Sequence, residues 1–195
     1  MLLLARHGRT AANAQGLLLG RLDPSLDRVG LLQAEALARV PAVAGARRVI
    51  SSPLLRARQT AEALGLPVTI DERWTEIDYG PFDGMPLSDV PASVWASWRD
   101  DPEWRPPGGE SLADVGRRVA TALEELAAAA EDDIVVVSHV SPLKAALAWA
   151  LGVGDGIAFR IHLTPACLNR VAVGPGRAAV VHSVNEVSHL DDVQR

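Results

Sequence analysis

Residues that can bind and attack a phosphate group stand together near the start of the sequence. Arg6, His7 and Asn13 follow a short apolar run at residues 2–4, which is typical of a buried parallel strand. An arginine presents a planar set of donors that fits a phosphate group, and a neutral imidazole can attack phosphorus. The combination favours an anion site at the end of the strand. A strand followed by an ordinary polar surface loop would contain the same residues.

Three more polar groups lie where predicted strands end or predicted helices begin. Arg56 lies in the first turns of a helix, Glu76 follows the third strand, and His139 follows a valine-rich strand. Because the carboxyl ends of parallel strands meet at one edge of a sheet, we expect these groups beside Arg6 and His7. Such a set around helix N-termini predicts a phosphoryl-transfer site that needs no metal.

Other interpretations of the same residues stay open at this point. A histidine after a strand is often a polar core or surface group, and the carboxylates of Asp78 and Asp83 lie close to Glu76 in the sequence. Arg9 and Arg21 are candidates for the mouth of the site, and Arg160 is a weaker one. Ordinary surface positions would suit these arginines equally well.

Apolar periodicity and turn residues predict the elements that position these groups. Strands and helices alternate, which predicts an α/β three-layer sandwich: a mostly parallel central sheet with helices on both faces. Ser52-Pro53 and Ser141-Pro142 are each predicted to begin a helix, with serine as the N-cap. The predicted strands are 2–4, 47–51, 68–70, 134–137, 168–173 and 178–184, the last two as a hairpin, and the predicted helices are 27–40, 53–64, 88–99, 111–130 and 141–151.

The segment 81–110 differs from the rest of the chain in composition. It holds six of the thirteen prolines and three of the five tryptophans. We therefore expect a single domain spanning 1–195, with 81–110 as a short cap-like excursion over the carboxyl ends of the strands. The tryptophans are expected to form the core of this excursion.

The composition excludes nucleic acid as a partner, a membrane span and an internal disulfide. The formal net charge of −5 argues against nucleic acid, which needs a basic face, and no apolar run approaches the roughly 18 residues of a membrane span. The single cysteine, Cys167, excludes an internal disulfide. We expect a cytoplasmic protein that uses no metal or other cofactor and binds a small phosphorylated substrate. The sequence leaves the oligomeric state undecided, with a homodimer as one alternative.

Four sequence blocks, in this order, resemble the histidine phosphatase superfamily, which has a phosphoglycerate mutase-like fold. The blocks are Arg6-His7-Gly8, residues 51–61 around Arg56, residues 76–84, and Val137-Ser138-His139. The resemblance covers almost the whole chain. Two departures stand out: Phe82 and Asp83 lie where tryptophan and glutamate are common in the family, and residues 140–142 replace a frequent Gly-Gly pair.

The resemblance implies a role for each candidate residue. His7 would be the nucleophile, while Arg6, Arg56 and His139 would bind the phosphoryl oxygens. Asn13 would add a neutral donor, and Arg9 and Arg21 are included as further substrate-binding candidates. Glu76 would protonate the leaving oxygen and later activate water. A neutral imidazole suits the attacking histidine, whereas an imidazolium would suit oxygen binding.

These roles predict a phosphatase that acts on a small phosphomonoester through a phosphohistidine. One alternative is a phosphomutase of the same chemistry, resembling the cofactor-dependent phosphoglycerate mutases. A second is a domain that binds a phosphorylated ligand without turnover, although such a domain has no need of an acid such as Glu76. The excursion 81–110 contains only two basic residues, Arg99 and Arg105, against six acidic ones, which disfavours a doubly phosphorylated ligand.

Overall fold

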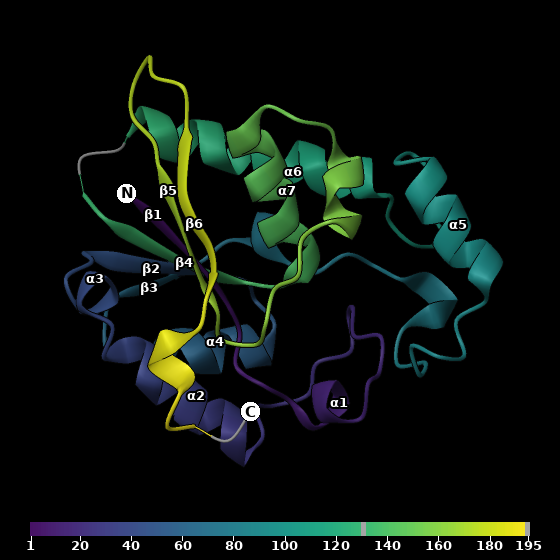
Figure 1. The fold of residues 1–195 in the computed structure, drawn as a ribbon, viewed down its shortest axis with the longest axis horizontal. Helices are drawn as coiled ribbons and strands as arrows, with labels where there is room; N and C mark the ends of the chain where they lie inside the picture. The colour runs from purple at the N-terminus through teal and green to yellow at the C-terminus, as the bar shows by residue number, and fades with distance from the viewer. Residues whose placement is uncertain (130–131, 194–195) are drawn as a thin grey trace.

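The computed structural model describes residues 1–129 and 132–193 (Figure 1). Its strands are β1 (Leu2–Arg6), β2 (Arg48–Ser51), β3 (Val68–Ile70), β4 (Ile134–Ser138), β5 (Leu168–Ala172) and β6 (Val180–Glu186). They form one sheet in the order β3-β2-β4-β1-β5-β6. The first four strands of this order run parallel to one another, whereas β5 is antiparallel to both β1 and β6. The mostly parallel sheet predicted from the sequence is confirmed.

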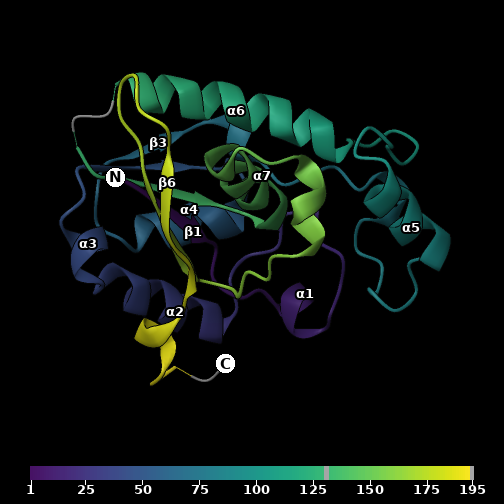
Figure 2. The same cartoon turned by 45° about the horizontal axis from the view of Figure 1, so that its top comes forward.

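Helices cover both faces of the sheet, which confirms the predicted layers (Figures 1 and 2). The helices are α1 (Ala11–Ala14), α2 (Arg28–Ala38), α3 (Pro41–Ala44), α4 (Leu55–Glu62), α5 (Ala92–Asp100), α6 (Leu112–Ala128) and α7 (Val140–Leu151), with short 3₁₀ turns η1 (Glu72–Trp74), η2 (Gly80–Phe82), η3 (Asp155–Phe159) and η4 (Ser188–Leu190). In both views α6 and α7 lie on one side of the sheet, and α2, α3 and α4 lie on the other. The predicted end of α6 near residue 130 lies outside the described residues.

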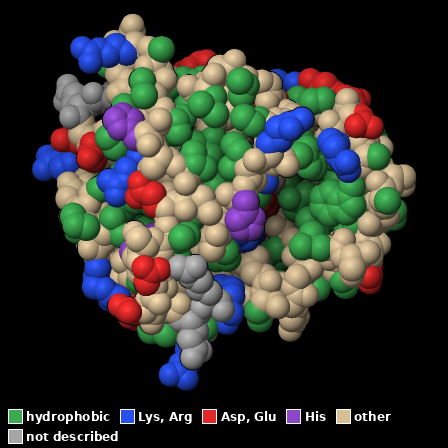
Figure 3. Space-filling model, viewed as in Figure 1, with side chains coloured by type: hydrophobic (Ala, Val, Ile, Leu, Met, Phe, Trp, Pro, Cys, Tyr) green, Lys and Arg blue, Asp and Glu red, His purple; other side chains and the backbone are tan. Residues whose placement is uncertain are grey.

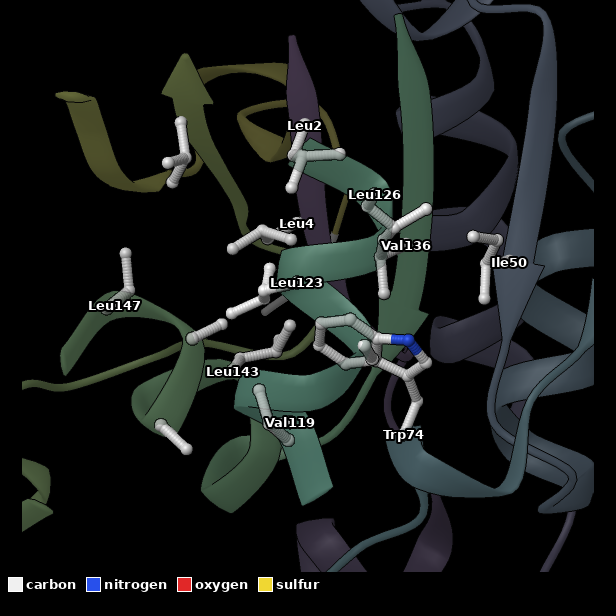
Figure 4. Close-up of a cluster of buried hydrophobic side chains, with 14 of the residues drawn as sticks. Leu2, Leu4, Ile50, Trp74, Val119, Leu123, Leu126, Val136, Leu143 and Leu147 are labelled. Atoms are coloured by element: carbon white, nitrogen blue, oxygen red, sulfur yellow. The ribbon is translucent and has the colours of Figure 1, made fainter. Parts of the chain in front are cut away.

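The central strands bury side chains on both faces. Leu2 and Leu4 of β1 pack with α6 and α7 around Trp74 (Figure 4). Leu3 and Ala5, which alternate with them, pack into the opposite cluster with α4. Because successive side chains of a strand point to opposite faces, a run that is apolar throughout needs cover on both sides. This burial fixes the position of β1, and with it the polar residues at its end.

The excursion 81–110 carries one helix, α5, which lies to the side of the sheet in both views (Figures 1 and 2). Trp98 of α5 is buried, with its ring centre 5.5 Å from that of Tyr79, 5.6 Å from Trp95 and 5.1 Å from Trp104. Aromatic rings at these spacings attract one another beyond their burial. Trp98 is therefore the centre of the segment's own packing.

Two helices begin later or earlier than the serine–proline pairs predict, because carboxylates distant in sequence cap them. Helix α4 begins at Leu55, whose N–H donates to Asp23 at 2.6 Å, and Ser52 does not serve as its N-cap. Helix α7 begins at Val140, and the carboxylate of Glu76 accepts its first N–H groups. The unpaired N–H groups at a helix start can donate to any well-placed oxygen, so both serines are free for other contacts.

The other differences are small. Helices α1 and α3 were not predicted, and each is four residues long. Reciprocal bonds between Thr10 and Asn13 cap α1. The last strand, β6, begins at Val180 and ends at Glu186, two residues later at each end than predicted. Asp27 caps α2 and Ser111 caps α6, as the sequence indicates.

No helix within residues 1–129 and 132–193 is both long and apolar enough to span a bilayer.

Candidate active site

His7 follows β1 directly and is held in one orientation. Its side chain is 3% exposed, and Nδ1 lies 2.7 Å from the carbonyl oxygen of Gly8. A carbonyl can only accept a hydrogen bond, so Nδ1 carries the proton and the lone pair stays on Nε2. Burial lowers the pKa of His7 well below 6.5, and the positive charges of Arg56 and Arg6 lower it further. His7 is therefore a neutral imidazole with a free Nε2.

A close backbone contact explains the glycine after His7. A Cβ atom on Gly8 would lie 2.5 Å from the carbonyl oxygen of Gly30 in α2, and a Cβ on Gly30 would lie 2.0 Å from that of Arg9. The Gly8 N–H also donates to Thr60 Oγ1 at 3.0 Å. The two glycines let α2 pack directly against the loop that carries His7.

Arg6 and Arg56 each keep a buried nitrogen without a partner. Arg6 Nη1 donates to the Leu163 carbonyl at 2.6 Å, and Arg56 donates to the Leu22 and Gly20 carbonyls at 2.7 and 2.8 Å. The Nε atoms of both arginines are buried without a partner. Burial lowers the pKa of Arg56 to about 10, while the carboxylate of Glu76 works against that shift. Both guanidiniums are charged at neutral pH.

Asp83 fixes the loop that holds Arg56. Its carboxylate accepts the N–H groups of Gly20, Arg21 and Leu22 at 2.7 to 2.8 Å. The carbonyls of Gly20 and Leu22 in turn accept from Arg56. Asp83 thus positions Arg56 through three backbone bonds, and it does not line the cavity described below. Asp78 likewise lies off the cavity and accepts from the Gly80 N–H.

His139 packs against His7 at the start of α7. The two ring centres are 5.0 Å apart, and His139 Nε2 lies 2.7 Å from Ser52 Oγ. Its Nδ1 is buried without a partner. Burial lowers the pKa of His139 well below 6.5, and the charge of Arg56 adds to the effect. The imidazolium expected from the sequence is therefore not favoured. A neutral ring that accepts from Ser52 would carry its proton on Nδ1.

Glu76 lies at the N-terminus of α7. Its carboxylate accepts the N–H groups of Val140 and Ser141, at 3.0 and 3.1 Å, and that of Ile77 at 2.9 Å. Three backbone donors hold a carboxylate in a single orientation. Glu76 is 3% exposed and lines the same cavity as His7.

A cavity of about 560 Å³ opens beside these residues. Arg6, His7, Asn13 and Glu76 line it, whereas Arg56 and His139 do not. Asn13 Oδ1 accepts from Thr10, which leaves the amide N–H groups as the part of Asn13 that can donate to a ligand. The structure therefore brings together Arg6, His7, Asn13, Arg56, Glu76 and His139.

The other three candidate arginines do not line the cavity. Arg9 pairs with Asp27 at 2.8 Å, and Arg21 pairs with Glu110 at 2.9 Å. The side chain of Arg160 is exposed. The structure does not bring these three arginines to the phosphate end of the cavity.

Sequence reasoning missed two contributors. Ser52 was interpreted as a helix cap, although its place directly after β2 matches the strand-end positions of the other candidates. The Nζ atom of Lys144, on the cavity wall, donates to the Ala158 carbonyl at 2.6 Å. Lys144 follows Ser141 by three residues in the sequence, one helical turn into α7, which is the only signal that could have placed it there. No group of three or more histidine, cysteine, aspartate or glutamate side chains gathers as metal ligands in the part of the chain that the structure describes.

Comparisons with known proteins match this chain along nearly its whole length. A model of the histidine phosphatase superfamily (branch 1) matches residues 2–186. A glucosyl-3-phosphoglycerate phosphatase of Mycolicibacterium vanbaalenii is 38% identical over 166 residues, covering 77% of this chain and 74% of the relative. A probable phosphoglycerate mutase of Yersinia enterocolitica is 33% identical over 202 residues, covering 96% and 94%. The first curated relatives matched are longer, and the chain spans about half their length, 54%.

A solved structure agrees with the fold. A mycobacterial glucosyl-3-phosphoglycerate phosphatase in complex with VO3 aligns with a TM-score of 0.83 at 29% sequence identity. The alignment covers 95% of this chain and 98% of that one.

Proposed function

This chain belongs to the histidine phosphatase superfamily (branch 1), and we propose that it hydrolyses a small phosphomonoester through a phosphohistidine at His7, without a metal. One observation carries the proposal. Arg6 Nε, Arg56 Nε and His139 Nδ1 are all buried without partners around His7. Buried polar atoms without partners are costly, and their gathering around the His7 ring supports a site for a phosphoryl group at this residue.

In the first half of the reaction His7 takes the phosphoryl group. The Nε2 lone pair forms a bond to phosphorus while the bond between phosphorus and the ester oxygen breaks. Glu76, once it has taken up a proton from solvent, gives that proton to the ester oxygen, and the substrate's alcohol leaves. The hydrogen bond from Nδ1 to the Gly8 carbonyl supports the positive charge that develops on the ring.

In the second half water removes the phosphoryl group. Glu76, now a carboxylate, takes a proton from water as the hydroxide oxygen bonds to phosphorus. The bond between phosphorus and Nε2 breaks, and its electron pair returns to His7. Inorganic phosphate leaves, and Glu76 again holds the proton with which it began.

The two guanidiniums stabilise the charge that moves between these states. Phosphoryl transfer has a loose transition state in which charge spreads over the equatorial oxygens. Arg6 and Arg56, fixed by backbone carbonyls on their other nitrogens, need no reorganisation to meet that charge. Fixed cations of this kind take the place that a metal ion holds in other phosphoryl-transfer sites.

The cavity favours hydrolysis over a mutase reaction. A mutase must hold a second anionic group of its substrate. Lys144 on the cavity wall already donates to the Ala158 carbonyl, and Arg9, Arg21 and Arg160 are the candidates that the sequence offers for this role. None of the three lines the cavity, and two of them are paired with carboxylates. The resemblance to a probable phosphoglycerate mutase makes the transfer reaction the alternative to be tested.

Two incubations separate the phosphatase from the mutase and from a domain that only binds. The protein is supplied with phenyl phosphate, and separately with 3-phosphoglycerate together with 2,3-bisphosphoglycerate. We expect release of inorganic phosphate from phenyl phosphate to exceed any interconversion of 2- and 3-phosphoglycerate. Interconversion much faster than phosphate release would establish the mutase, and the absence of any turnover would contradict the phosphatase and favour the binding domain.

A further inference from the structure

We propose that the alcohol part of the substrate is an apolar alkyl or aryl group, which occupies the outer half of the cavity. The inference rests on the proposed phosphatase activity. The cavity that holds His7 and Glu76 at one end continues to α5 at the other. Because the ester oxygen must lie between Nε2 of His7 and the carboxyl group of Glu76, the rest of the alcohol has to lie in that continuation.

The outer half of the cavity has apolar walls. Leu17 comes from the loop after α1, Leu87, Trp95 and Trp98 come from the excursion, and Phe159 ends η3. Figure 3 shows hydrophobic side chains gathered in a hollow on the right of the molecule, beside the position of α5 in Figure 1. An apolar pocket with a few polar groups at one end is typical of small-molecule sites, and the polar groups fix the orientation of the ligand.

Two of these side chains lie open to solvent at the rim. Leu87 is 46% exposed and Phe159 is 41% exposed. When an apolar ligand covers apolar surface that otherwise contacts water, the free energy of the complex is lowered. A sugar or glycerate group would not bury this apolar surface to the same extent. Its hydroxyl groups would also lie against apolar side chains that offer no hydrogen bond.

Packed aromatic rings hold the part of the apolar wall around Trp98. Trp98 is 2% exposed and contacts the rings of Tyr79, Phe82, Trp95 and Trp104, with centre distances from 5.1 to 6.2 Å. A wall held in this way does not have to be ordered when the ligand binds, so its contacts contribute fully to affinity.

Charged groups are scarce along the same walls. Of the described residues that line the cavity beyond Arg6 and His7, only Lys144 and His162 can carry a positive charge. Lys144 already donates to the Ala158 carbonyl at 2.6 Å, and His162 is exposed. A carboxylate or second phosphate on the substrate would therefore depend on Lys144, which makes this residue the way to test the opposite inference.

The experiment compares kcat/KM for methyl, butyl and hexyl phosphate and for 3-phosphoglycerate. Full burial of one methylene group is worth roughly fourfold in kcat/KM, so butyl phosphate should exceed methyl phosphate by up to about sixtyfold. The Leu87→Gln and Phe159→Gln variants should each lower the hexyl-to-methyl ratio by up to about tenfold. Leu151→Gln, at a comparably exposed leucine off the cavity, is the matched control and should keep the wild-type ratio.

A flat alkyl series would overturn the inference and leave the phosphatase proposal standing. So would a preference for 3-phosphoglycerate that is lost in Lys144→Met, because the outer half would then recognise an acid. If none of these esters, nor phenyl phosphate, is hydrolysed, the proposed function itself fails.

Discussion

Acid should destabilise this protein through its two buried histidines. In the folded state the pKa values of His7 and His139 lie well below 6.5, because burial and the charge of Arg56 oppose protonation. In the unfolded chain each imidazole titrates near its ordinary pKa of about 6.5. Below that pH the unfolded state binds protons that the folded state does not. The stability that the neutral histidines contribute is therefore complete above pH 6.5 and is lost as the pH falls.

The size of the effect follows from linkage. While one histidine stays neutral in the folded state, each pH unit below 6.5 costs about 1.4 kcal/mol of stability. Between pH 7.5 and pH 5.5 one histidine should therefore cost about 1.4 kcal/mol, and the pair about twice as much. For a domain stable by roughly 5–15 kcal/mol, that is a substantial share.

Urea unfolding followed by tryptophan fluorescence measures this, at both pH values and in a buffer without phosphate. Carboxylates titrate in every variant, so the informative quantity is the difference from the wild type. His7→Asn and His139→Asn should each lose about 1.4 kcal/mol less between pH 7.5 and pH 5.5. His182→Asn, at an exposed position on β6, is the matched control and should behave as the wild type does.

A His7→Asn variant whose free energy of unfolding keeps the wild-type pH dependence would refute this prediction. His7 would then titrate alike in the folded and unfolded states, and the burial beside two guanidiniums that defines this site would have no electrostatic consequence.

Three further predictions concern the chemistry. Glu76→Gln should slow hydrolysis of hexyl phosphate by more than tenfold (about 1.4 kcal/mol). The first half-reaction of phenyl phosphate should be affected less, because an alkoxide leaving group needs a proton more than a phenolate does. A loss smaller than tenfold with hexyl phosphate would point to another acid. Ser52→Ala removes the hydroxyl 2.7 Å from His139 Nε2 and should lower kcat/KM by about tenfold, whereas a wild-type value would show that Ser52 does not set the tautomer. Exhaustive chelation should leave activity unchanged, and a loss restored by divalent ions would contradict the metal-free mechanism.

The fold was predictable because its strongest signals are local. Residues 2–4 and 134–137 are apolar throughout, and such runs belong in doubly covered strands. Asp27 and Ser111 cap their helices through bonds that span three residues, and a sequence pattern can contain such bonds. The gathering of Arg6, His7, Arg56, Glu76 and His139 followed from topology, because parallel strands deliver their carboxyl ends to one edge.

What sequence reasoning missed depends on contacts between distant residues. The start of α7 is capped by Glu76, 64 positions away along the chain from Val140, and no local pattern encodes that bond. For the same reason Ser52 was interpreted as a cap, when its hydroxyl contacts His139 instead. The pairing of Arg21 with Glu110 likewise joins two segments far apart in the sequence, so no local pattern predicts it.

The central claim is that His7 carries the phosphoryl group, and trapping that adduct tests it most directly. Wild-type protein mixed with ³²P-labelled phenyl phosphate and quenched within one turnover should carry label that is stable in base and lost in acid, as expected of a phosphoramidate. His7→Ala should remain folded and carry no such label. A label that survives acid, or the same label on His7→Ala, would contradict the assignment of His7 as the nucleophile.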